Sequence, residues 1–132
     1  MKKTDGHSLE YLLGFDGRRH FYKGGYWLKF EIKQVGTSAK RPHGLDYSFT
    51  LHGPDGTRLI GFDNAHPVPA EGSRFKKPSV EADHWHRTQS DPGRPYKFRN
   101  AEKLIDDFFN EVERVLTDHG IPFDVIRVDE RR

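Results

Sequence analysis

The sequence predicts an α+β fold: an antiparallel sheet of five or six strands, arranged as a meander, packed against one long C-terminal helix. Apolar and polar residues alternate through residues 26–35 and 45–51, and a Gly-Pro-Asp-Gly turn then leads into a return strand, residues 58–63. Between residues 101 and 116 the apolar residues recur instead at steps of three and four. A period of two is typical of half-buried strands, and a period near 3.6 is typical of an amphipathic helix.

Composition limits the class of protein. The 132 residues are enough for one core, and 10 Phe, 5 Tyr and 2 Trp can fill it although only 33% of the residues are hydrophobic. The absence of cysteine excludes disulfides, thiolate metal sites and cysteine nucleophiles. No segment resembles a signal peptide or a membrane span. We therefore expect a flexible N-terminus at residues 1–8, a single domain at 9–132, and a cytoplasmic protein that does not enter a membrane.

The first half of the chain supplies most of the expected sheet. Alternating apolar residues predict a first strand over residues 9–15, followed by a glycine-rich turn with basic residues. Residues 26–35 form the most regular alternation, and residues 45–51 repeat it. The turn at residues 53–56 closes a hairpin, because proline fixes φ in a type I turn and glycine accepts a positive φ after it. In the longest strand we expect one buried face, made of Tyr26, Leu28, Phe30 and Ile32.

The second half supplies the helix and the remaining strands. Residues 67–78 are a proline- and lysine-rich loop, and residues 83–88 and 96–98 read as short extended segments. Asn100 can cap the helix that follows, and Gly120 and Pro122 can end it. Residues 121–128 are expected to form a last strand. Its core candidates are Phe123, Val125 and Ile126.

The candidate functional site lies where these strands end. His84 and His86 are two residues apart, so both point to one face if the segment is extended, with Trp85 on the other. Asp63, at the end of the preceding strand, could close the cluster together with His66. We expect these four residues, Asp63, His66, His84 and His86, to carry any catalysis.

Three interpretations of this cluster remain open. A metal site would use His66, His84 and His86 with Asp63 or Asp83 as ligands, a set that suits zinc or manganese. A metal-free site would use one histidine as general base for a ribose 2′-hydroxyl and another as general acid for the leaving oxygen. In such a catalytic site, Lys29, Arg74, Lys76, Lys77 and Arg87 would stabilise charge on the substrate phosphate. In the third interpretation the histidines are ordinary polar residues without a catalytic role.

Other features narrow the function classes. The chain lacks the motifs of P-loop and dinucleotide-binding proteins, serine hydrolases and helix-borne zinc proteases. Basic residues exceed acidic ones before residue 100, and acidic residues dominate after it. The basic part could attract a nucleic acid, whereas the acidic helical part would repel one.

A series of short motifs precedes an acidic amphipathic helix: residues 43–49, Phe62-Asp63-Asn64-Ala65-His66, Asp83-His84-Trp85-His86-Arg87 and Tyr96-Lys97-Phe98. Over roughly residues 20 to 117, this series resembles the TumE family of toxin–antitoxin operons. The family's strand-end motif, an aromatic residue followed by Asp-Asn and then histidine, is present here, but only one histidine follows Asp63-Asn64. This departure from the family's pattern counts against a full metal site. The resemblance implies a toxin with a helix-turn-helix antitoxin as partner and RNA cleavage as its activity. A non-catalytic nucleic-acid-binding or partner-binding module is the alternative, and a homo-oligomer remains open.

Overall fold

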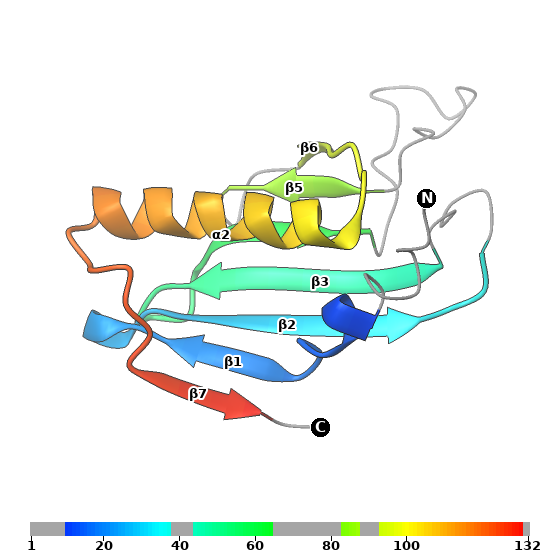
Figure 1. The fold of residues 1–132 in the computed structure, drawn as a ribbon. Coiled ribbons are helices and arrows are strands. Elements are labelled where there is room, and N and C mark those ends of the chain that lie inside the picture. The colour runs from blue at the N-terminus through cyan, green and yellow to red at the C-terminus, as the bar shows by residue number, and fades with distance from the viewer. Residues whose placement is uncertain (1–9, 38–43, 65–82, 88–92, 131–132) are drawn as a thin grey trace.

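The described residues form one sheet with a long helix on one of its faces. A computed structural model describes residues 10–37, 44–64, 83–87 and 93–130. Within these ranges seven strands pair antiparallel in the order β6-β5-β4-β3-β2-β1-β7 (Figure 1). The elements are β1 (Arg18–Phe21), η1 (Lys23–Gly25), β2 (Trp27–Gln34), β3 (Leu45–His52), β4 (Arg58–Asp63), β5 (His84–His86), β6 (Arg94–Pro95), α2 (Ala101–Asp118) and β7 (Arg127–Glu130).

The predicted α+β class is confirmed, because β1 to β6 follow one another as a meander and α2 packs against them. The alternation in β2 and β3 predicted their faces correctly: Leu28, Phe30 and Ile32 are buried, and their neighbours Lys29, Glu31 and Lys33 lie on the opposite face. The turn after β3 is closed by a hydrogen bond that the Gly56 N–H donates to the Gly53 carbonyl at 2.9 Å. This turn lets β4 pair antiparallel with β3.

The helix was also predicted correctly. The Asn100 side chain accepts a hydrogen bond from the Lys103 N–H at 2.8 Å, which satisfies a donor that the first turn leaves without a helical partner. Phe108 sits in the middle of the apolar stripe and is fully buried. Its ring lies 5.5 to 5.7 Å from aromatic rings of three neighbouring strands, Phe30, Phe49 and Phe62.

The first predicted strand was wrong. Residues 10–13 are helical, and the Gly14 N–H donates to the Glu10 carbonyl at 3.1 Å. Leu12 is fully buried and Phe15, three residues later, packs against the core. The side chains that this segment turns inward are therefore spaced as on one face of a helix. Tyr11, which the alternation would have turned inward, is 43% exposed. The first strand is instead β1, in the segment that its basic residues suggested was a turn.

The last predicted strand was wrong in its bounds and in its core residues. The strand begins at Arg127, where β7 pairs with β1 at the edge of the sheet. Ile121 packs against the core, whereas Phe123, Val125 and Ile126 are exposed by 38%, 43% and 65%. The chain must pass from the end of α2 to the far edge of the sheet, and these residues lie in that connection. Residues 96–98 are not a strand either; the short β6 precedes them.

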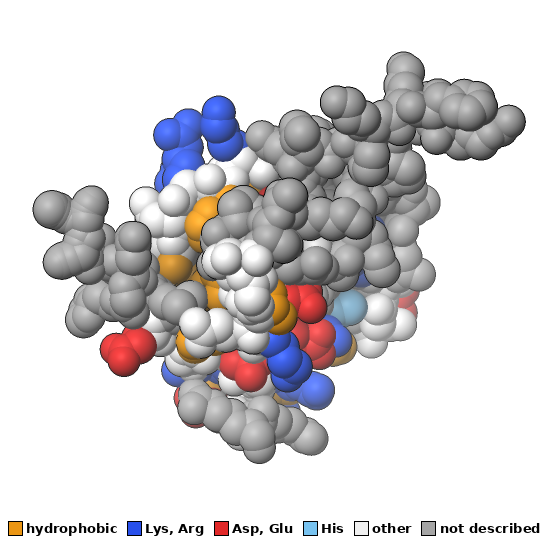
Figure 2. Space-filling model, turned by 90° about the vertical axis from the view of Figure 1, so that its right-hand side faces the viewer, with side chains coloured by type: hydrophobic (Ala, Val, Ile, Leu, Met, Phe, Trp, Pro, Cys, Tyr) orange, Lys and Arg blue, Asp and Glu red, His pale blue; other side chains and the backbone are white. Residues whose placement is uncertain are grey.

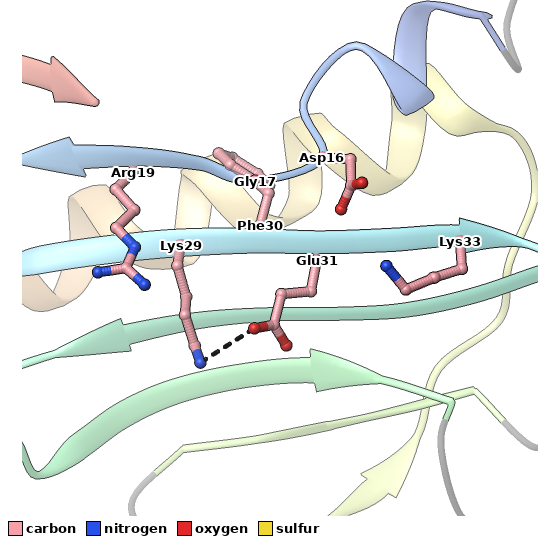
Figure 3. Close-up of a pocket in the computed structure, with 7 residues that line it drawn as sticks. All are labelled: Asp16, Gly17, Arg19, Lys29, Phe30, Glu31 and Lys33. Carbon is pink, nitrogen blue, oxygen red and sulfur yellow. Dashed lines mark hydrogen bonds and ion pairs between the residues drawn. The ribbon is translucent and has the colours of Figure 1, made fainter. Parts of the chain in front are cut away.

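The two faces of the sheet therefore differ. One face packs against α2, while the other, which we call the helix-free face, has no helix over it among the described residues (Figures 1 and 3). The helix-free face carries Arg19, Lys29, Glu31 and Lys33, and Figure 3 shows α2 behind the sheet in this view. No helix in the described ranges is long and apolar enough to cross a bilayer.

A buried histidine makes stability depend on pH. His20 of β1 is 8% exposed, stacks on Phe109 of α2 with ring centroids 5.9 Å apart, and has no hydrogen-bond partner for either ring nitrogen among the described residues. Burial, and next the nearby Arg18, lower the pKa of His20 from 6.5 to about 4. Between these two pH values the unfolded chain binds more protons than the folded one, so stability falls as the pH falls.

We expect His20→Phe to raise the free energy of unfolding at pH 7 by about 1 kcal/mol, because it removes two unpaired polar atoms from the core. Wild type should lose up to about 3 kcal/mol more than the variant between pH 6.5 and 4. Urea unfolding at pH 7.5, 6.0 and 4.5 measures the difference. The control is His119→Phe, a histidine exposed after α2. Parallel pH profiles for wild type and His20→Phe would contradict this account.

Candidate active site

Two of the predicted site residues meet where β4 and β5 pair. Asp63 lies opposite His84 in the register, and Gly61 lies opposite His86. Residues two apart on a strand share a face, so Asp63 and His86 are diagonal neighbours. Their side chains meet with Asp63 Oδ2 and His86 Nε2 3.4 Å apart, and are 18% and 11% exposed. The carboxylate therefore fixes the position of the imidazole on the helix-free face.

Two glycines shape the surroundings of His86. Gly93 has φ of +102°, and a Cβ added to it would stand 2.5 Å from His86 Cε1 and 2.7 Å from Nδ1. Only a residue without a side chain can approach the ring this closely. Gly61, opposite His86, leaves room for Arg58, whose Cδ would be 3.2 Å from a Cβ at that position. The Arg58 side chain thus lies over Gly61, the residue opposite His86 in the register.

Asp83 belongs to the other side of the sheet. It is 6% exposed, and its Oδ2 accepts a 2.7 Å hydrogen bond from the hydroxyl of Tyr47. Burial, together with the Asp83 charge, raises the pKa of Tyr47 well above its usual 10, so the hydroxyl remains a donor. The Asp83 carbonyl also accepts from the Tyr96 N–H at 2.9 Å. These contacts tie the residue before β5 to β3, across β4, and to the segment after β6, so Asp83 supports the sheet and is separate from the Asp63–His86 pair.

Asn64 braces the end of β4. It is fully buried, its Oδ1 accepts from the Tyr47 N–H at 2.9 Å, and its Nδ2 donates to the Leu45 carbonyl at 2.7 Å. The side chain therefore continues the pairing of β4 with β3 one residue beyond the strand. Because Asp63 is the preceding residue, the same hydrogen bonds fix the backbone that presents its carboxylate.

The remaining predicted residues lie in several places. His66, Arg74, Lys76 and Lys77 lie outside the described residues, as does the side chain of His84. Arg87 is exposed and its guanidinium carbon lies 5.4 Å from the Trp85 ring, on the opposite side of β5 from His86. Lys29 shares a cross-strand row with His86 through Thr50 and Gly61, three strands away. Neighbouring strands are about 4.8 Å apart, so this row spans about 14 Å.

The donor set fits a metal only in part. Among the described residues, no three His, Asp or Glu side chains come together as a metal site. The 3.4 Å between His86 Nε2 and Asp63 Oδ2 nevertheless suits two ligands of one tetrahedral ion. With bonds of about 2.1 Å, ligands in that geometry are also about 3.4 Å apart. A third ligand would have to come from His84 or His66.

Comparison with known proteins settles the family. The family model described as toxin TumE matches residues 4–116. The chain belongs to the TumE family. No curated protein and no solved structure matches it. As a TumE toxin it is one component of a toxin–antitoxin system, and its partner is an antitoxin.

The Asp63–His86 pair gives this TumE protein a group that can transfer a proton. An imidazole can act as a proton acceptor or donor, and an adjacent carboxylate can orient the ring. The end of the molecule facing the viewer in Figure 2 carries acidic and basic side chains and a histidine close together.

Sequence reasoning missed Tyr47, Arg58 and Gly93. The Tyr47–Asp83 bond joins residues 36 positions apart, which no local pattern reveals. Arg58 had a recognisable signal, because a glycine inside a strand often marks a site where another group approaches closely. Gly93 follows a proline in a turn motif, and nothing in that motif indicates contact with a histidine.

Proposed function

We propose that this TumE toxin is a small ribonuclease in which Asp63 and His86 carry proton transfer. The supporting observation is the 3.4 Å contact between these side chains at the rim of a face that also holds Lys29 and Arg58. One imidazole would take the proton of a ribose 2′-hydroxyl as the oxygen attacks phosphorus. A second acid, His84 or His66, would protonate the leaving oxygen. The cationic side chains of this face, Arg58 and Lys29, would stabilise the charge that develops on the phosphate.

Single substitutions test this proposal. His86→Gln and Asp63→Asn keep the side-chain size but remove the imidazole or the carboxylate charge. Acid–base groups contribute about 10²- to 10⁴-fold, so RNA cleavage by the purified variants should fall by at least about 100-fold. Growth of bacteria expressing either variant should recover. The matched control is His119→Gln, at the end of α2, and thermal melting checks that each variant is folded.

Equal RNA cleavage by wild type and His86→Gln would reject the proposed site. RNA binding without cleavage by any form would favour the alternative, a non-catalytic nucleic-acid-binding module. Zinc or manganese held by Asp63, His66, His84 and His86 is the other chemistry open to this site. Dialysis against a chelator separates the two mechanisms, because acid–base cleavage continues without a metal and metal-assisted cleavage stops.

The proposed antitoxin is a helix-turn-helix protein encoded beside the toxin, as the TumE resemblance implies. Co-expression of the two proteins should restore growth and yield a complex on purification. Recovery of growth without a complex would contradict direct neutralisation.

A further inference from the structure

A row of aromatic and cationic side chains crosses the helix-free face. The register places Arg127, Phe21, Trp27, His52 and Arg58 opposite one another on β7, β1, β2, β3 and β4. The Trp27 and His52 rings stack with centroids 4.4 Å apart, and the Phe21 and Trp27 rings with centroids 6.4 Å apart. The Arg127 guanidinium lies 4.1 Å from the centre of the Phe21 ring. We call these five residues the aromatic row.

The central rings of the aromatic row remain accessible and are held in place. Phe21, Trp27 and His52 are each half-buried. His52 is fixed by contacts of Nε2 with the Thr50 hydroxyl at 2.9 Å and of Nδ1 with the Gly56 carbonyl at 3.1 Å. Burial, followed by the charges of Lys29 and Arg58, lowers the pKa of His52. At neutral pH the row therefore presents three uncharged, half-buried rings that stack on one another.

Cations surround these rings. Arg19 and Lys29 face each other directly across β1 and β2, and the Arg19 guanidinium carbon is 5.7 Å from the Trp27 ring. Lys29 Nζ also lies 3.4 Å from Glu31 Oε2, so a phosphate at Lys29 would compete with this exposed ion pair. Beside them is a depression of about 260 Å³, lined by Asp16, Gly17, Arg19, Lys29, Phe30, Glu31 and Lys33 (Figure 3).

The acidic residues of this face lie mainly toward its other end. Glu31 of β2, Asp46 of β3 and Asp63 of β4 are two or more residues beyond the aromatic row along their strands. Asp129 lies opposite Arg19 and is the acidic residue nearest the row in the register. The end of the face that carries the rings is thus mainly cationic.

We infer that the aromatic row binds single-stranded RNA, with bases stacked on Trp27 and Phe21 and phosphates held by Arg19, Lys29 and Arg127. This inference rests on the proposed action on RNA and assigns the surface that holds the substrate. Unpaired bases offer open faces for stacking, whereas a duplex hides them. The three contiguous rings are flanked by cations, so this surface can contact both the bases and the phosphates of such a strand. Phe21 and Trp27 also lie within residues 4–116, the part that matches the TumE family model.

The position of the aromatic row connects it to the candidate active site. The next row along the same face contains Lys29, Thr50, Gly61 and His86. From Trp27 the path to His86 crosses three strand spacings and two residues, about 16 Å in total. A strand bound on the aromatic row could therefore extend to the Asp63–His86 pair.

Binding is tested with a fluorescent oligouridylate whose 2′-hydroxyls are methylated, with electrophoresis to check that it remains intact. We expect Trp27→Leu and Phe21→Leu each to weaken binding by about 10-fold or more, because each removes one stacking surface. The bound oligonucleotide should quench tryptophan fluorescence in wild type and much less in Trp27→Leu. The matched control is Phe123→Leu, an exposed aromatic residue outside this face, and thermal melting checks that each variant is folded.

The phosphate contacts have a separate signature. Arg19→Gln should reduce the slope of log affinity against log salt concentration by about 0.7, the value for one phosphate contact on a single strand. Arg114→Gln, on the exposed side of α2, should leave the slope unchanged. Wild-type affinity in both ring variants, equal affinity for a duplex, or no binding by wild type would each overturn the inference. Ring-dependent binding of this probe, together with no cleavage of unmodified RNA, would instead reject the ribonuclease proposal and leave the RNA-binding surface standing.

Discussion

Replacing Asn64 with alanine is expected to lower the free energy of unfolding by about 3–5 kcal/mol and to abolish toxicity. The substitution breaks two buried hydrogen bonds at once, from the Tyr47 N–H and to the Leu45 carbonyl. Each backbone group left unpaired in the core costs about 1–3 kcal/mol. Urea unfolding followed by far-ultraviolet circular dichroism measures the loss. Asn110→Ala, on an exposed position of α2, is the control and should change stability little.

Asn64→Asp distinguishes hydrogen bonding from packing at the same site. At neutral pH the new carboxylate could still accept from Tyr47, but it could not donate to Leu45 and would carry a buried charge. Burial raises the pKa of such a carboxyl, so the variant should be closest to wild type below about pH 4 and fall behind as the pH rises. A constant difference from wild type between pH 4 and 7.5 would mean that packing, and not the donor, explains the effect.

The sequence predicted the sheet well where alternation is long. Eight residues of β2 and eight of β3 pair along their whole length, so a pattern of period two had many positions to support it. The four alternating apolar residues from Leu9 to Phe15 were too few, because Leu12 and Phe15 satisfy a helical spacing equally well. The exposed residues Phe123 and Ile126 show the opposite problem: an apolar connection can resemble a buried strand. Its true position depends on where α2 ends relative to the sheet.

The contact between Asp63 and His86 was predictable to the extent that it depends on strand ends, whereas a catalytic role for the pair stays a prediction. Asp63 and His86 were named from a strand boundary and an H-x-H spacing, and the register brings them into contact. The residues that hold the pair in place were not predictable in this way. Tyr47 meets Asp83 through tertiary packing, and the approach of Gly93 to His86 depends on the backbone of a turn. A local sequence pattern reveals neither the Tyr47–Asp83 contact nor the close approach of Gly93 to His86.

Gly93→Ala should reduce toxicity and RNA cleavage by at least about 100-fold, as loss of the acid–base group would. The added Cβ would stand 2.5 Å from His86 Cε1, so either the imidazole or the turn must move. Displacing the ring separates Nε2 from the Asp63 carboxylate. A positive φ also disfavours alanine, and this backbone strain adds about 1–2 kcal/mol of instability.

Gly56→Ala separates the strain from the displacement. Gly56 has φ of +88°, close to the +102° of Gly93, but nothing lies within 4 Å of a Cβ added there. Both variants should therefore lose about 1–2 kcal/mol of stability from the backbone, and only Gly93→Ala should lose cleavage. The histidine ring protons in an NMR spectrum report whether His86 has moved. If Gly56→Ala loses cleavage as fully as Gly93→Ala, general instability explains the effect, and the close packing against His86 has no special role in the site.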